Sequence, residues 1–269
     1  MKAVLPALLL GVAACAAPAT SGQDGDLPTI VSLNPCADAI LAEVAQPQQI
    51  LALSHYSSRE GASSMDIAVA RRFDSTAGTA EEVLALAPDI VIGDIFMSPS
   101  TKAALERAGV EVVQVGITGT LEDSDAQVRQ VAEAAGAKAR GEALVARIHA
   151  AWEAAAAEGE PVTALLWQDG GIVPGETSLA TQLLEQAGFA SHSAARGLGQ
   201  GAYLPLEQVL ADPPQVILAA GDERMLTHPV LRRMSDAHYA SFDPGLLYCG
   251  GPTIPRALAR LVEIRETIR

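Results

Sequence analysis

The sequence predicts an α/β protein with two Rossmann-like lobes, each built around a central parallel sheet, joined by one long connecting helix. Strand and helix patterns alternate over residues 29–115 and again from residue 162 onwards, as is typical of parallel sheets covered by helices. Residues 121–157 carry only helix patterns. The expected division is 1–26 for a signal peptide and tether, 27–118 for the N-terminal lobe, 119–159 for the helical connector and 160–269 for the C-terminal lobe.

An internal echo is the third observation that predicts two lobes. Residues 79–94 read TAEEVLALAPDIVIGD, which indicates a short helix, a proline stop and a buried strand. Residues 206–219 read LEQVLADPPQVILA and repeat this pattern, with Glu81 matched by Glu207 and Pro88 by Pro214. The spacing is too long for a solenoid repeat. Chance is the alternative, because helix–proline–strand segments are common in α/β proteins.

The elements of the N-terminal lobe follow a β-α-β-α-β-α-β order. Expected strands cover 29–33, 50–53, 90–92 and 110–115. Asn34 and Pro35 open the first helix as cap and first-turn residue. Further helices are expected at 65–73, at 79–87, and from Ser98 or Ser100 to a stop at Gly109.

The connector and the C-terminal lobe follow. One helix is expected over 121–135, and a second over 138–157, which would form a rod of roughly 30 Å. The α/β pattern then restarts with a strand at 162–167 and a helix at 178–187, followed by the echo segment. A short helix at 229–234 and a long helix from about residue 253 end the chain.

Composition limits the function classes. The chain has 269 residues, of which 49% are hydrophobic, enough for one large core or two smaller ones. Its formal net charge is −14, from 32 acidic and 18 basic residues, which argues against nucleic acid as a partner. Aromatic residues make up only 4% of the chain, so a site walled mainly by aromatic rings has few residues to draw on.

The N-terminus has the pattern of an export signal. Lys2 precedes an apolar run over residues 3–14 that is too short to span a bilayer. Residues 12–15, Val-Ala-Ala-Cys, resemble a lipobox in which Cys15 is lipidated, and a cut after Ala19 is the alternative. Either way we expect a periplasmic protein, with or without a lipid anchor.

The cysteines then allow two interpretations. Export places the chain in an oxidising compartment, where an even number of cysteines favours disulfides. If Cys15 carries lipid, Cys36 and Cys249 remain as a pair. A disulfide between them would tether the lobes and limit their opening. Two small buried thiols are the alternative.

Six segments, taken in order, resemble the periplasmic binding proteins of ABC importers, in the family that binds ferric siderophores, haem and vitamin B12. They are VSLNPCADAIL, LALSHYS and EEVLALAPDIVIGD in the first lobe, and GETSLATQLLEQAGF, LPLEQVLADPPQVILAAG and CGGPTIPRALARL in the second. The resemblance covers residues 28–269. It implies a monomer without enzymatic activity or cofactor, which captures an iron chelate or cobalamin between its lobes and delivers it to a membrane permease driven by an ATPase.

The resemblance also implies that each lobe presents a glutamate to arginines of the permease. The matching residues are Glu81 and Glu207, which the internal echo pairs independently. A carboxylate near a helix N-terminus is stabilised by the helix dipole, and a bidentate arginine contact gives orientation. The alternative is that both residues only stabilise the first turns of exposed helices.

Ligands of open α/β sheets bind beyond the carboxyl ends of the strands. The residues expected at those ends are Asn34, His55, Tyr56, Asp94, Phe96, Trp167, Gln168, Tyr203, Asp222 and Tyr248. For Trp167, core packing is an equal alternative. The tryptophans that stack on the corrin in vitamin B12 binders are replaced near Ala77, Asp94 and Gln200 by small or polar residues, which weakens the case for a corrinoid.

Two other functions remain as alternatives. A relative of this fold binds bare zinc or manganese with several His and acidic residues, but the five His here show no HxxxH spacing, and we assign no metal site. A secreted α/β enzyme is the second alternative. The chain contains no GxSxG elbow, no P-loop and no GxGxxG after a strand, so we assign no catalytic residue.

Overall fold

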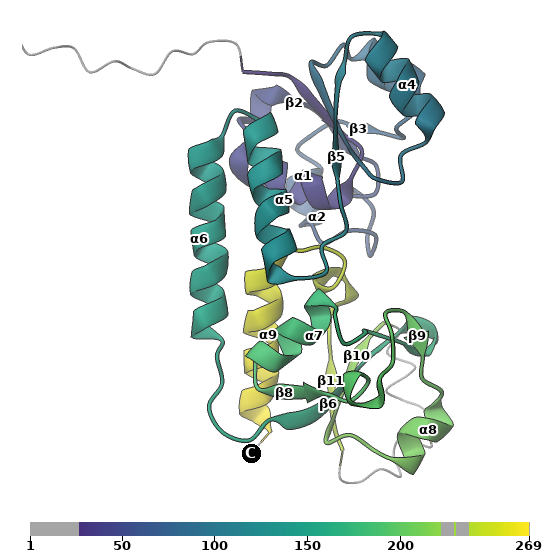
Figure 1. The fold of residues 1–269 in the computed structure, drawn as a ribbon, viewed down its shortest axis with the longest axis vertical. Coiled ribbons are helices and arrows are strands. Elements are labelled where there is room, and N and C mark those ends of the chain that lie inside the picture. Colours follow the sequence, from purple (N-terminus) through teal and green to yellow (C-terminus); the bar gives the residue numbers. More distant parts are fainter. Residues whose placement is uncertain (1–26, 222–228, 230–236, 269) are drawn as a thin grey trace, which may run out of the picture.

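The computed structural model describes residues 27–221, 229 and 237–268. The predicted signal peptide, Cys15, Asp222 and most of the helix expected at 229–234 lie outside these described residues. The structure is an α/β fold with parallel sheets in two lobes, as the sequence predicts (Figure 1).

The sheet of the first lobe has five parallel strands in the order β3-β2-β1-β4-β5. They are β1 (Ile30–Ser32), β2 (Ile50–Ser54), β3 (Ser75–Thr76), β4 (Ile90–Asp94) and β5 (Glu111–Val115). The chain moves outward from β1 in one direction and then returns to build β4 and β5 on the other side. The strand order therefore reverses between β1 and β4, which is where open sheets of this kind bind ligands.

Polar side chains begin the helices of this lobe. Asn34 accepts hydrogen bonds from two backbone amides of the first turn of α1 (Pro35–Val44). Thr79 caps α3 (Ala80–Ala85), and Ser98 caps α4 (Pro99–Arg107). The helix expected at 65–73 is shorter: Asp66 caps α2 (Ile67–Ala70), and the chain turns at Arg71 to reach β3.

Two long helices follow, as expected for the connector. They are α5 (Leu121–Ala134) and α6 (Lys138–Ala154), separated by Gly136 in a left-handed conformation with φ of 65°. The 17 residues of α6 give a length of about 25 Å. α6 contacts α5 and α1 of the first lobe and α9 (Thr253–Thr267) of the second, so it runs alongside both lobes (Figure 1).

Gly141 sets the close approach of α5 and α6. A Cβ atom on Gly141 would lie only 2.4 Å from the Cβ of Ala132. We therefore expect Gly141→Ala to lower the free energy of unfolding by about 1–3 kcal/mol through overpacking, although alanine is the better helix former. Chemical denaturation measures this. The matched control is Ala146→Gly at an exposed site of the same helix, which should cost about 1 kcal/mol. A stabilised Gly141→Ala variant would contradict this packing.

The sheet of the second lobe has four parallel strands in the order β11-β10-β6-β8. They are β6 (Val162–Gln168), β8 (Phe189–Ser191), β10 (Val216–Ala220) and β11 (His238–Ser241). α7 (Leu179–Gln186) covers one face and α8 (Leu206–Ala211) the other. A separate antiparallel pair, β7 (Ile172–Val173) and β9 (Ala202–Tyr203), stands beside this sheet.

The hydrophobic core continues from one lobe into the other. The largest cluster of buried residues contains Ile92 of β4 and Leu166 of β6, together with Ile148 of α6 and Leu258 of α9. Two smaller clusters lie on the outer faces, under α3 and α4 in the first lobe and under α8 in the second. The inner faces of both sheets therefore share one helical layer, which resists large movements of one lobe against the other.

The segment between β11 and α9 returns to the first lobe. Gly251 donates its backbone N–H to Ser124 Oγ of α5 at 2.8 Å, and Arg256 donates to the Ser64 carbonyl oxygen at 2.8 Å. Cys249 forms a disulfide with Cys36 near the start of α1, with their Cα atoms 5.3 Å apart. The C-terminal lobe is thus attached to the first lobe by covalent and hydrogen bonds next to the space between them. Within the described residues, no helix combines the length and the hydropathy that crossing a membrane requires.

Candidate functional site

Large apolar side chains are exposed where the strands of both lobes end. Phe96 follows β4 and is 73% exposed, Ile117 follows β5 and is 71% exposed, and Tyr203 of β9 is 64% exposed. Tyr56, which follows β2, and Tyr248, which precedes α9, are about half exposed. Phe96, Ile117 and Tyr248 line the two cavities described next, whereas Tyr56 and Tyr203 line neither. Exposed apolar groups that line one cavity mark a binding site, because water makes their exposure unfavourable.

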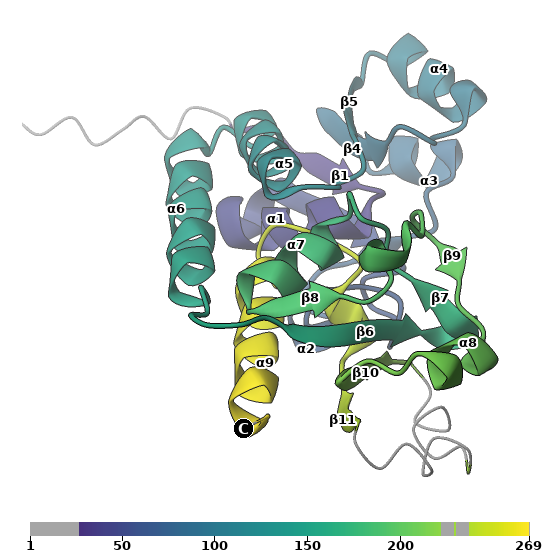
Figure 2. The same cartoon turned by 60° about the horizontal axis from the view of Figure 1, so that its bottom comes forward.

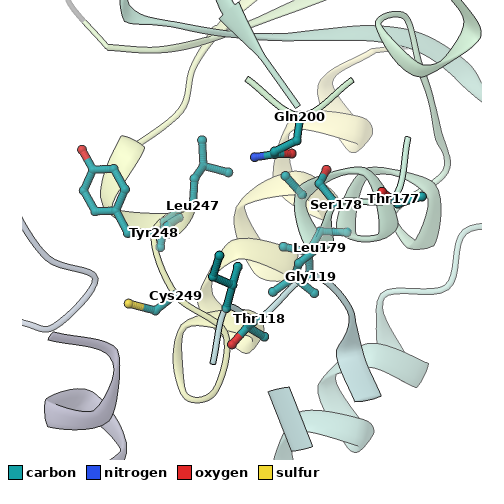
Figure 3. A pocket seen from close by; sticks show the side chains of 13 residues that line it. Thr118, Gly119, Thr177, Ser178, Leu179, Gln200, Leu247, Tyr248 and Cys249 are labelled. Carbon is teal, nitrogen blue, oxygen red and sulfur yellow. The ribbon is translucent and has the colours of Figure 1, made fainter. Parts of the chain in front are cut away.

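One cavity of about 230 Å³ lies between the lobes. Figure 3 shows its frame, with Gln200 above, Thr118 below, Leu247 on one side and Ser178 on the other. Thr118 belongs to the first lobe, and the other three residues come from the second. Cys249, one half of the disulfide, also lines this cavity.

A second cavity of about 190 Å³ adjoins the first at the point where the strand order reverses. Its lining includes Asn34 after β1 and Asp94 with Phe96 at the end of β4. Ile117 and Tyr248 line both cavities. The two cavities are therefore neighbouring parts of a single cleft, with Ile117 from the first lobe and Tyr248 from the second at their junction.

Tyr248 also connects the cleft to the turn after β2. Its hydroxyl donates to the carbonyl oxygen of Gly61 at 3.1 Å. In the same loop the rings of His55 and Tyr56 lie with their centroids 4.1 Å apart, and the Arg59 guanidinium lies 5.8 Å from the Tyr56 ring centroid. This distance allows a cation–π contact, which holds the exposed tyrosine ring beside a positive charge.

The polar residues expected in the cleft have structural roles there as well. The Asn34 side chain is engaged in capping α1, accepting from the amides of Cys36 and Ala37. Asp94 Oδ1 accepts the backbone N–H of Phe96 at 2.7 Å and so fixes the loop that carries the phenylalanine. Gln168 is half-buried at the end of β6 and lines neither cavity.

Trp167 requires a correction. It is only 6% exposed and packs with Leu165, Val173 and Val209 on the outer face of the second sheet. Because side chains alternate along a strand, Trp167 of β6 points to the face that α8 covers. The structure thus supports the core alternative for this residue and gives it no place in the cleft.

The start of α7 lines the first cavity, which the sequence did not predict. Thr177, Ser178 and Leu179 face this space (Figure 3). Ser178 caps α7, and its hydroxyl also donates to the Gly175 carbonyl oxygen at 2.8 Å. The available signal was the helix start at Ser178, but a cap alone does not show which cavity a helix end faces.

The described histidines have local partners. His149 Nε2 lies 2.6 Å from Asp125 Oδ2, between α6 and α5. His192 Nε2 lies 2.8 Å from the Asp212 carbonyl oxygen, and burial lowers the pKa of this imidazole. Within the part of the chain that the structure describes, no three His, Cys, Asp or Glu side chains are grouped as ligands for a metal ion.

Glu81 and Glu207 occupy equivalent places in the two lobes. Each lies in the first turn of a short helix, α3 or α8, that covers the outer face of its sheet, and each side chain is exposed. Figure 2 shows α3 and α8 on the side of the molecule opposite α6. The two carboxylates therefore lie on helices that flank the interlobe space.

Comparison with known proteins identifies the fold. A family model described as "Periplasmic binding protein" matches residues 30–237. Among solved structures, the periplasmic heme-binding protein RhuT from Roseiflexus sp. RS-1 shares 23% identity, with a TM-score of 0.71 over 90% of this chain and 98% of that one. The heme-binding protein HutB of Vibrio cholerae shares 16% identity, with a TM-score of 0.73 over 88% of this chain and 98% of that one.

The vitamin B12 binding protein BtuF of Vibrio cholerae is also similar in structure. It shares 16% identity, with a TM-score of 0.67 over 89% of this chain and 97% of that one. None of the curated protein sequences matches this chain.

Proposed function

The chain belongs to the periplasmic binding protein family, and we propose that it is the exported substrate-binding component of an ABC importer. In this proposal it captures an iron chelate, either a siderophore or haem, or a cobalamin between its lobes and delivers it to a permease and its ATPase. The observation that carries the proposal is the apolar lining of one cleft by both lobes, with Phe96 and Ile117 from the first lobe and Leu247 and Tyr248 from the second.

The chemistry of this lining favours a ligand with apolar faces. Phe96 and Ile117 leave most of their surface in water, and a flat organic ring system placed between the lobes covers both. A metal that arrives inside such a chelate brings its own ligands and needs few from the protein. The similar structures described as heme-binding proteins support haem, and the structure of BtuF supports a cobalamin.

A binding screen tests this proposal. The soluble protein is titrated with hemin, cyanocobalamin, a panel of ferric siderophores, Zn²⁺ and Mn²⁺, and followed by tryptophan fluorescence and thermal shift. We expect saturable binding of one chelate class at micromolar concentration or below. Binding of Zn²⁺ or Mn²⁺ alone would support the bare-metal alternative. No binding across the panel would reject the proposal and return attention to an enzyme.

Two substitutions locate the bound ligand. We expect Phe96→Ser and Ile117→Ser each to weaken binding of the ligand found in the screen by about 10-fold or more, because each removes roughly 1.5–3 kcal/mol of apolar burial. The unfolding midpoint should stay unchanged, since both side chains are exposed in the free protein. Leu86→Ser is the matched control, because Leu86 is 40% exposed and lines neither cavity. Equal affinities for all three variants would place the ligand elsewhere.

Docking to the permease is the second part of the proposal. Glu81 and Glu207 are equivalent, exposed and on helices that flank the cleft, so both can face one partner while the ligand is held between them. Arginines on the partner would bind these carboxylates in a bidentate manner.

A further inference from the structure

His55 and Tyr56 stand at the tip of a tight turn at the end of β2. The backbone N–H of Ser57 donates to the Ser54 carbonyl oxygen at 3.0 Å, which closes the turn with the two aromatic residues at its centre. Tyr56 is 46% exposed, and its ring packs against His55. The direction of the Tyr56 ring therefore depends on how firmly this turn is held.

A single buried carboxyl group holds both ends of the turn. Asp38 Oδ2 accepts the backbone N–H of Ser54 at 2.9 Å and the hydroxyl of Ser57 at 2.6 Å. Asp38 has no exposed surface and lies in the first turn of α1, two residues after the disulfide-bonded Cys36. The turn is thus fastened to a helix that is itself covalently attached to the second lobe.

A carboxyl group is an unfavourable choice for a purely structural contact at this position. Its second oxygen, Oδ1, is buried and has no hydrogen-bond partner within the described residues. Burial raises the pKa of Asp38 to about 7. The hydrogen bonds to this carboxyl group lower its pKa, but their effect is smaller than that of burial. The two groups that hydrogen-bond to Oδ2 are neutral, the Ser54 backbone amide and the Ser57 hydroxyl, and the nearby Ser32 hydroxyl of β1 is neutral as well. The other ionisable side chains of this loop are His55, Tyr56, Arg59 and Glu60.

We propose that Asp38 is a positioning residue for ligand binding, which sets how firmly the turn at 54–57 presents Tyr56 and His55, and that its protonation state changes this hold. The effect of Asp38 on ligand binding rests on the proposed function. The effect of Asp38 on the turn does not. An ionised carboxylate forms stronger hydrogen bonds than a neutral carboxylic acid. The turn is therefore held more firmly above neutral pH than below it.

Global stability changes with pH in the opposite direction. The pKa of Asp38 is higher in the folded protein than in the unfolded chain, so the folded protein binds the extra proton between about pH 4 and pH 7. The contribution of this group to stability is complete below pH 4 and is lost as the pH rises through 7. A tighter turn and a less stable fold at higher pH together distinguish this residue from an ordinary buried contact.

Asp38→Asn tests the proposal, because the amide keeps the shape and one acceptor oxygen but does not titrate. In the wild-type protein we expect the exchange protection of the Ser54 amide to increase from pH 6 to pH 8, after correction for the intrinsic rate, while the unfolding midpoint decreases. In Asp38→Asn the increase in protection should disappear, and the unfolding midpoint should no longer decrease over this range. The affinity for hemin, used as the probe, should change about threefold over this range in the wild type and stay constant in the variant.

Two further variants keep the test decisive. Ser57→Ala removes one of the two hydrogen bonds without changing the carboxyl group, and should loosen the turn even if Asp38→Asn does not fold. Asp125→Asn is the control, since Asp125 is also buried but pairs with His149 away from this turn. If hemin binds but Asp38→Asn keeps the wild-type exchange and pH profiles, Asp38 has no such role. If hemin does not bind, exchange at Ser54 still tests the hold on the turn, and only the ligand of the proposed function is rejected.

Discussion

Replacing Cys36 and Cys249 together by serine is expected to lower the free energy of unfolding by about 2–5 kcal/mol. The two cysteines are 213 residues apart in the sequence, so the disulfide closes a very long loop and restricts the unfolded chain strongly. Guanidinium denaturation of the wild-type protein and the double variant measures the difference. Added reductant should lower the wild-type midpoint to that of the variant.

The disulfide has an internal control. Reductant should leave the midpoint of the Cys36→Ser, Cys249→Ser variant unchanged, because no other disulfide occurs in the described residues. A thiol count under denaturing conditions without reductant, on a protein without Cys15, provides a separate check. Two reactive thiols in the protein without Cys15, or equal midpoints for the wild-type protein and the double variant, would contradict a disulfide between the lobes.

Reversing the charge of Glu81 and Glu207 to lysine is expected to abolish uptake while ligand affinity stays within about twofold of the wild type. Losing one partner of an interfacial charge pair costs about 2–5 kcal/mol, and two such losses are comparable to the binding free energy of a micromolar complex, which is about 8 kcal/mol. Uptake by cells and affinity of the purified protein are measured in parallel. Each single variant should lower uptake less than the pair.

Glu158→Lys is the matched control for this pair. Glu158 is exposed in the connection between α6 and β6, and its reversal changes the net charge of the chain by the same amount as either single reversal. Its uptake should equal that of the wild type. Normal uptake by the Glu81→Lys, Glu207→Lys variant would leave these residues as stabilisers of their own helix turns.

Much of the fold could be predicted because its signals are local in the sequence. Asn34, Thr79 and Ser178 cap helices where the sequence indicated helix starts, and the aliphatic runs at 90–92 and 216–218 form strands covered on both faces. The strands β3, β7, β8, β9 and β11 were not predicted. They have only two to four residues each, too few for a clear periodic pattern, and their pairing depends on contacts distant in the sequence.

The candidate site was predicted less completely for the same reason. Loops that follow strands could be selected, which placed Asn34, Asp94, Phe96 and Tyr248 around the cleft. Side chains alternate along a strand, so two neighbouring residues at a strand end point to opposite faces of the sheet. Trp167 points to the face that α8 covers. The return of the chain to the first lobe before α9 also brought Leu247 into the cleft, and no local pattern indicates such a crossing.

Hydrogen exchange with and without the ligand identified in the screen tests most directly the claim that both lobes hold one ligand. The structure predicts slower exchange in the loops after β4 and β5 of the first lobe and, in the same sample, at residues 177–183 and 246–249 of the second. The α6 helix should exchange as in the free protein. Slower exchange confined to one lobe, or centred away from these segments, would contradict a binding site between the lobes.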